Sequence, residues 1–82
     1  MNPTDQTHFV VISSNSELAS GDWVEAYYKG ALVHRGEVTD IAPNHDLFWI
    51  LDVLNGGRRL LDIAEFEIRK AGSHAALRSS SN

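Results

Sequence analysis

The sequence predicts an all-β fold of five to six short strands, and three observations support this. Residues 23–28 alternate between two sets of side chains, which is the period-two pattern of a half-buried strand. Two glycine turns, Lys29-Gly30 and Asn55-Gly56-Gly57, each lie between apolar stretches of strand length. Glycine adopts the backbone conformations that tight hairpin turns require. We therefore expect paired hairpins that curl into a small barrel.

Length and composition restrict the protein to a single small domain. A chain of 82 residues buries only about 60 to 65% of the surface that it exposes when unfolded, and its core rarely supplies more than about 3 to 5 kcal/mol. Cysteine is absent, which excludes disulfides, thiolate catalysis and thiolate zinc sites. Association with a partner or with a second copy is therefore the expected reinforcement.

The chain divides into three regions. We expect a flexible N-terminus at 1–7, one domain at 8–70 and a disordered tail at 71–82, because the tail is rich in small residues and serine. The longest apolar stretch falls short of the roughly 20 residues that a membrane helix needs, and the N-terminus lacks a signal-peptide pattern. A soluble, cytoplasmic protein is expected.

The domain is predicted to open with a short strand at 8–12 and a polar linker at 13–20, where Ser14 and Glu17 are placed to cap one helical turn.

A strand pair is predicted on either side of Lys29-Gly30. In the first strand, Trp23–Tyr28, Val24 and Ala26 should point inward. In the second, Ala31–Ile41, Gly36 suggests a bulge or bend.

Segment 47–54 allows two structures. Its aromatic and β-branched residues, followed by Asn55-Gly56, favour a strand that pairs with 58–61. Its apolar residues also fall at helical spacing, so the alternative is an α+β fold with a helix at 46–55. A single turn at 63–65 and a last strand at 66–69 would complete an SH3-like barrel.

Two families show a resemblance over residues 21–70. The framework resembles tudor-type domains in Gly21-Asp22-Trp23-Val24-Glu25-Ala26-Tyr27-Tyr28, His34-Arg35-Gly36-Glu37-Val38, and Leu51-Asp52 before Asn55-Gly56. It also resembles type II, plasmid-borne dihydrofolate reductases in Gly21-Asp22 with Val24, Gly30-Ala31, Gly36 and the stretch Leu61 to Arg69. The matched positions are mostly those that build the barrel.

The functional motifs of both families are missing. A methyl-ammonium cage needs three or four aromatic faces, whereas the tudor resemblance places Tyr28, Val33, Phe48 and Val53 at that site. The reductases hold folate and nicotinamide with Val-Gln-Ile-Tyr, where this chain has Arg58-Arg59-Leu60-Leu61. The second resemblance still implies a symmetric oligomer. No catalytic residue and no cofactor is predicted.

Exposed aromatic and arginine side chains are the best candidates for a binding site. If Val24 and Ala26 point inward, Trp23 and Tyr27 point outward, where residues 9–12 could cover them or a partner could bind them. The predicted binding residues are Trp23, Tyr27, Tyr28, Trp49, Arg58 and Arg59.

Asp52 interrupts the most apolar run, so burial would raise its pKa and suggest a functional role. The alternative is that Asp52 points outward or pairs with Arg58 or Arg59 across the hairpin. The four histidines lack the spacing of a metal site, and no metal is predicted.

Three functions follow, in order of preference. The first is a non-enzymatic interaction module that binds a protein partner or itself as a homo-oligomer. The second is an oligomer that binds a small anionic ligand, or acts like a reductase, on its symmetry axis, where Arg58 and Arg59 of several subunits would converge. The third is a nucleic-acid-binding barrel, against which the net charge of -4 argues.

Overall fold

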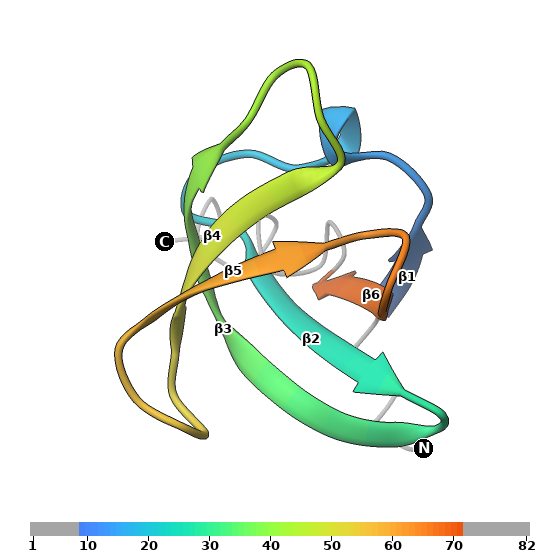
Figure 1. The fold of residues 1–82 in the computed structure, drawn as a ribbon, viewed down its shortest axis with the longest axis vertical. Coiled ribbons are helices and arrows are strands. Elements are labelled where there is room, and N and C mark those ends of the chain that lie inside the picture. Colours follow the sequence, from blue (N-terminus) through green and yellow to red (C-terminus); the bar gives the residue numbers. More distant parts are fainter. Residues whose placement is uncertain (1–8, 72–82) are drawn as a thin grey trace, which may run out of the picture.

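Six strands join one antiparallel sheet in the computed structural model, which describes residues 9–71 (Figure 1). Their order across the sheet is β1-β6-β2-β3-β4-β5. The strands are β1 (Phe9–Ile12), β2 (Trp23–Tyr28), β3 (Ala31–Ile41), β4 (Leu47–Asp52), β5 (Arg58–Asp62) and β6 (Glu67–Ala71), with one 3-10 turn, η2 (Asn15–Glu17). The all-β prediction is confirmed. The alternative helix at 46–55 is wrong, because β4 occupies this segment and pairs on both sides.

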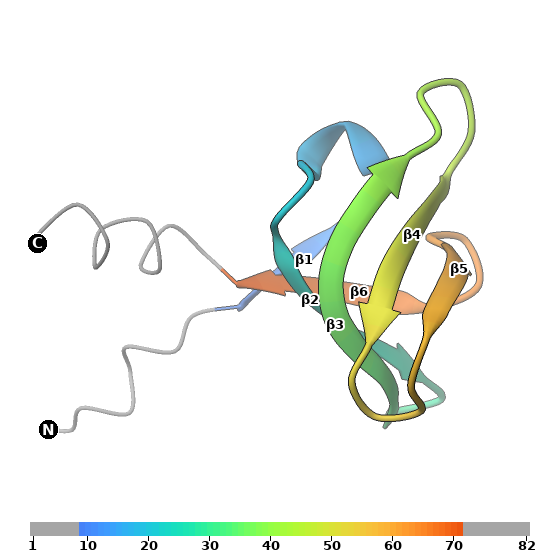
Figure 2. The same ribbon diagram turned by 90° about the vertical axis from the view of Figure 1, so that its left-hand side faces the viewer.

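The sheet bends because β3 is long and irregular. Its 11 residues run along both β2 and β4, and Figure 2 shows their curvature. The register shifts leave Val33 unpaired opposite β2 and Thr39 unpaired opposite β4. Each extra residue increases the local twist. The irregularities therefore lie on either side of Gly36, where the sequence suggested one.

Gly36 has a different role from the expected bulge. A Cβ atom built there would lie 1.8 Å from the carbonyl oxygen of Leu51 on β4. Only glycine lets the two backbones approach this closely.

The two predicted glycine turns differ in length. Lys29 and Gly30 both have positive φ, 51° and 83°, which is the two-residue turn that matches the twist of a hairpin. Residues 55–57 instead belong to a longer loop, because β4 ends at Asp52 rather than at the expected Leu54. The Asp52 carboxylate accepts hydrogen bonds from the backbone N–H groups of Leu54 and Asn55, which turns the chain early.

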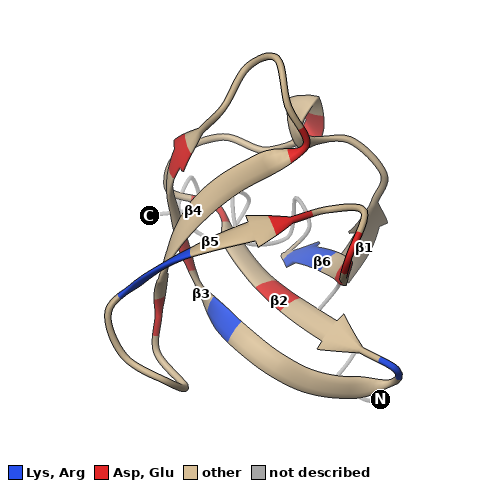
Figure 3. Cartoon of the chain, in the orientation of Figure 1, with Lys and Arg blue, Asp and Glu red and all other residues tan. Residues whose placement is uncertain are grey.

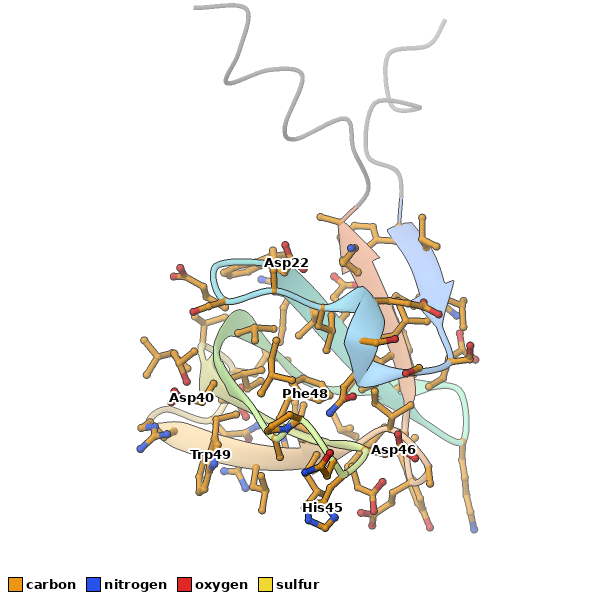
Figure 4. The ribbon with its side chains drawn as sticks, turned by 90° about the horizontal axis from the view of Figure 1, so that it is seen from above. Asp22, Asp40, His45, Asp46, Phe48 and Trp49 are labelled. Atoms are coloured by element: carbon orange, nitrogen blue, oxygen red, sulfur yellow. The ribbon has the colours of Figure 1, made fainter. Side chains whose placement is uncertain are left out.

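The core lies on the concave side of the sheet. Val24 and Ala26 are fully buried, as predicted. Figure 4 shows Phe48 toward the centre of the molecule and Trp49 at its periphery, as alternation along β4 requires. The buried apolar residues are Ile12, Leu18, Val24, Ala26, Val38, Phe48, Ile50, Leu61, Ile63 and Ile68.

The segment before β2 is fixed to the β3–β4 loop by a buried asparagine. Ser14 caps η2, as expected, by accepting a hydrogen bond from the N–H of Ser16. Asn15 is buried, and its Nδ2 donates to the carbonyl oxygens of Ala42 (2.8 Å), Leu47 (3.1 Å) and His45. No pattern in the sequence identified this contact.

β6 continues through Ala71, the first residue of the predicted tail, while the predictions for 1–7 and for the rest of the tail lie outside the described residues. Over residues 9–71, no helix has the length and apolar character for crossing a membrane.

Candidate functional site

The convex face of β4 and β5 exposes a group of large apolar side chains. Because Phe48, Ile50 and Asp52 point inward, alternation directs Trp49 and Leu51 outward. Trp49 lies directly opposite Leu60 on β5, and Leu51 lies opposite Arg58. Leu51 is 46% exposed and Leu60 is 45% exposed. We call these four residues, Trp49, Leu51, Arg58 and Leu60, the β4–β5 face.

Arg58 lies over the Trp49 ring on this face. Its guanidinium carbon is 4.4 Å from the ring centroid, and its Nη2 donates to Oδ2 of Asp40 at 3.0 Å. Asp40 and Trp49 are paired in register on β3 and β4 and lie side by side in Figure 4. An ion pair this exposed contributes little stability. It does orient the guanidinium over the indole.

Arg59 points to the opposite face of β5. Its Nε donates to Oδ2 of Asp52 at 2.9 Å, so the predicted pairing across the hairpin occurs. The same oxygen accepts from Nδ1 of His34 (2.8 Å) and from Nδ2 of Asn55 (2.9 Å). The Asp52 side chain is fully shielded from solvent. This cluster joins β3, β4, β5 and the loop between β4 and β5.

The pKa of Asp52 is lowered, contrary to the expectation from burial. Burial acts to raise the pKa, but the hydrogen bonds from Asn55, His34 and the backbone of Leu54 stabilise the carboxylate more strongly. An ionised Asp52 requires that Nδ1 of His34 carries the proton that it donates. With all these donors directed at it, Asp52 has a structural role.

Tyr27 is covered by its own neighbours on β2 and β6. The guanidinium carbon of Arg69 lies 4.0 Å from its ring centroid, and its hydroxyl donates to Oε1 of Glu25 at 2.9 Å. This hydrogen bond to a carboxylate, with desolvation, raises the pKa of Tyr27. Tyr27 is thus partly withdrawn from the surface. Trp23 remains 37% exposed, and β1 pairs with β6 rather than with β2.

The positions expected for a tudor-type cage do not form one. Phe48 is fully buried in the core, whereas Val53 is 56% exposed in the loop after β4. Tyr28 contacts Phe66 edge to face, with a centroid separation of 6.1 Å, and Phe66 contacts His34 in the same way. These positions therefore do not direct several aromatic faces at one cation.

Of the six predicted binding residues, the structure brings Trp49 and Arg58 into contact. Trp23 shares their face of the sheet but is separated from them by β3, while the other three pack elsewhere. Asp40, Leu51 and Leu60 complete the arrangement and were not predicted. Counting in steps of two from Trp49 would have identified Leu51.

Neither metal ligands nor known relatives assign a function to the described residues. Within residues 9–71, no group of three or more histidine or acidic side chains could hold a metal ion. Comparison of the chain with protein-family models, curated proteins and solved structures found no significant match.

Proposed function

We propose that this chain is a non-enzymatic interaction module that binds protein through the β4–β5 face. The observation that carries the proposal is the contact of the Arg58 guanidinium with the partly buried Trp49 ring, beside two leucines that are each nearly half exposed. Tryptophan and arginine are the residues most enriched at the energetic centres of protein interfaces. A small domain benefits from covering such a surface.

The preorganisation of Arg58 favours recognition. Its guanidinium is already oriented by Trp49 and Asp40, so less side-chain freedom is lost on binding. The leucines on either side supply the apolar area that would exclude water around this pair.

The other two candidate functions have weaker support. Arg58 and Arg59 lie on opposite faces of β5, so the pair does not converge on one anionic ligand within the chain. Asp40 neutralises Arg58, and the net charge is -4, which opposes binding to phosphate backbones.

Site-specific photo-cross-linking tests the proposal. A photoreactive residue replaces Leu51 in the full chain, and the matched control places it at Val10, which is similarly exposed on β1. We expect a reproducible protein adduct in cell extract from position 51 alone, reduced by Trp49→Ala in a chain that circular dichroism shows to be folded. Equal adducts from both positions, or none from position 51, would contradict the proposal.

A further inference from the structure

β5 forms an open edge of the sheet. It pairs with β4 on one side, and among residues 9–71 no strand pairs with its other side. The N–H of Asp52 donates to the carbonyl of Gly57 at 2.8 Å, and the N–H of Ile63 donates to the carbonyl of Asp46 at 2.9 Å. Backbone groups that face β4 therefore belong to the odd-numbered residues from 57 to 63. Because this direction alternates along a strand, those of Arg58, Leu60 and Asp62 face the open edge.

The side chains on β5 that share the face of Leu60 carry opposite charges at the two ends of the strand. Arg58 begins β5, exposed Leu60 is its centre, and Asp62 ends it. Figure 3 shows the two charges as blue at the start of β5 and red at its end. Natural edge strands are usually protected by charges that repel another copy. In an antiparallel copy the order of the two charges is reversed, so the basic end of one edge faces the acidic end of the other. The edge therefore attracts its own copy instead.

We propose that a second copy of this chain docks antiparallel along β5, with the two-fold axis at Leu60. This inference adds a second copy of the chain as a partner at the edge beside the β4–β5 face, and it rests on the proposed function as an interaction module. Leu60 then lies opposite its counterpart, and Arg58 of each copy lies opposite Asp62 of the other. Opposite charges on directly paired residues stabilise an antiparallel ladder.

Backbone hydrogen bonds would hold the two β5 strands in this antiparallel register. The two Leu60 residues exchange two N–H to C=O hydrogen bonds, and each Asp62 N–H donates to the Arg58 carbonyl of the other copy. The carbonyl of Asp62 already accepts from the N–H groups of Glu65 and Phe66, so it adds none. The joined sheet extends each β4–β5 face continuously into that of its partner.

The opposite edge of the sheet, β1, is apolar and lacks this charge pattern. Val10 and Val11 are both exposed there, but β1 has no charged residue to specify a partner. Its sequence also continues directly into residues outside the described range.

Charge exchange tests the pairing with purified full-length chain. Sedimentation equilibrium over a concentration series should show a monomer–dimer equilibrium that weakens at higher salt. Arg58→Glu places two acidic pairs across the axis, and Asp62→Arg places two basic pairs. Each variant should dimerise about tenfold more weakly, whereas an equal mixture restores both ion pairs and should approach the affinity of the original chain.

Two further variants protect the test against misfolding. Asp62 Oδ1 accepts a hydrogen bond from the N–H of Ala64, so Asp62→Arg could disturb the turn. Leu60→Pro instead removes an N–H that faces the open edge together with the exposed leucine side chain, and should abolish the dimer while the sheet remains folded. Glu65→Lys makes the same acid-to-base change as Asp62→Arg but in the exposed turn after β5, and it should leave the dimer unchanged.

Several results would overturn the pairing. These are a monomer at every concentration, a dimer that Arg58→Glu and Leu60→Pro leave unaffected, or a mixture no stronger than its separate components. A monomeric chain that still forms the adduct from position 51 would overturn the pairing and leave the proposed function standing. A chain that neither dimerises nor forms the adduct from position 51 would refute both proposals.

Discussion

Asp52→Asn should be among the most destabilising conservative substitutions in this domain. The amide has the shape of the carboxylate but carries no charge and replaces one acceptor oxygen by a donor. Three side-chain donors, from His34, Asn55 and Arg59, converge on one oxygen of Asp52, and backbone N–H groups approach the other. Either orientation of the amide therefore places its NH2 group against donors.

The expected loss follows from the burial of this cluster. Breaking a buried charged pair by removing one partner costs about 3 to 5 kcal/mol. The side chain of Arg59 is 40% exposed and can rehydrate, so the lower end of about 3 kcal/mol applies. For a domain of this size, that corresponds to a decrease in Tm of about 12 to 24 °C.

Urea denaturation followed by tryptophan fluorescence measures this change. The midpoint should fall while the slope stays constant, because the amount of surface exposed on unfolding is the same. Asp40→Asn is the matched control, since its ion pair with Arg58 is exposed and should contribute less than about 1 kcal/mol. If Asp52→Asn lies within about 0.5 kcal/mol of the original chain, the structural role assigned to Asp52 is refuted.

The same substitution should also alter the response to acid. The pKa of Asp52 in the folded chain lies below its ordinary value of 3.8, so the carboxylate contributes its full stability above that value. This contribution is lost as the pH falls from about 4 toward the lowered pKa. The stability of Asp52→Asn should therefore depend less on pH over this range, and parallel curves for the two proteins would contradict the assignment.

Three further substitutions test the fold. Asn15→Ala removes the donor to three loop carbonyls and should cost about 1 to 3 kcal/mol by urea denaturation; an effect no larger than that of Ser16→Ala, on the exposed side of η2, would contradict it. Gly36→Ala should abolish the folded circular dichroism spectrum, because its Cβ would overlap the β4 backbone. Gly30→Ala meets open space and only strains a positive φ, so it should cost about 1 to 2 kcal/mol and leave the fold intact. Similar stabilities for the two alanine variants would show that close backbone approach does not explain Gly36.

Local patterns predicted most of the strands. Alternation located β2 with its observed bounds, and the glycine at position 30 located the turn after which β3 begins. The error at the end of β4 had a tertiary cause. Leu54 continues the apolar run, but the inward Asp52 captures the following backbone N–H groups and ends the strand.

The candidate site was predicted only in part, because side-chain partners depend on register. Adjacent arginines must point to opposite faces of a strand, but which one reaches Trp49 depends on how β5 pairs with β4. Asn15 illustrates the same limit. Its contacts lie far along the chain, in a loop whose conformation no local pattern specifies.

The position of β1 has a consequence for synthesis of the chain on the ribosome. β1 joins the sheet through β6 alone, so the first strand to emerge has no neighbour until residues 67–71 have left the exit tunnel. The intervening hairpins can assemble from sequential neighbours, which favours rapid local folding. Until β6 emerges, the nascent chain also exposes the β2 backbone that β6 later covers. The emergence of β6 therefore covers β2 and joins β1 to the rest of the sheet in one step.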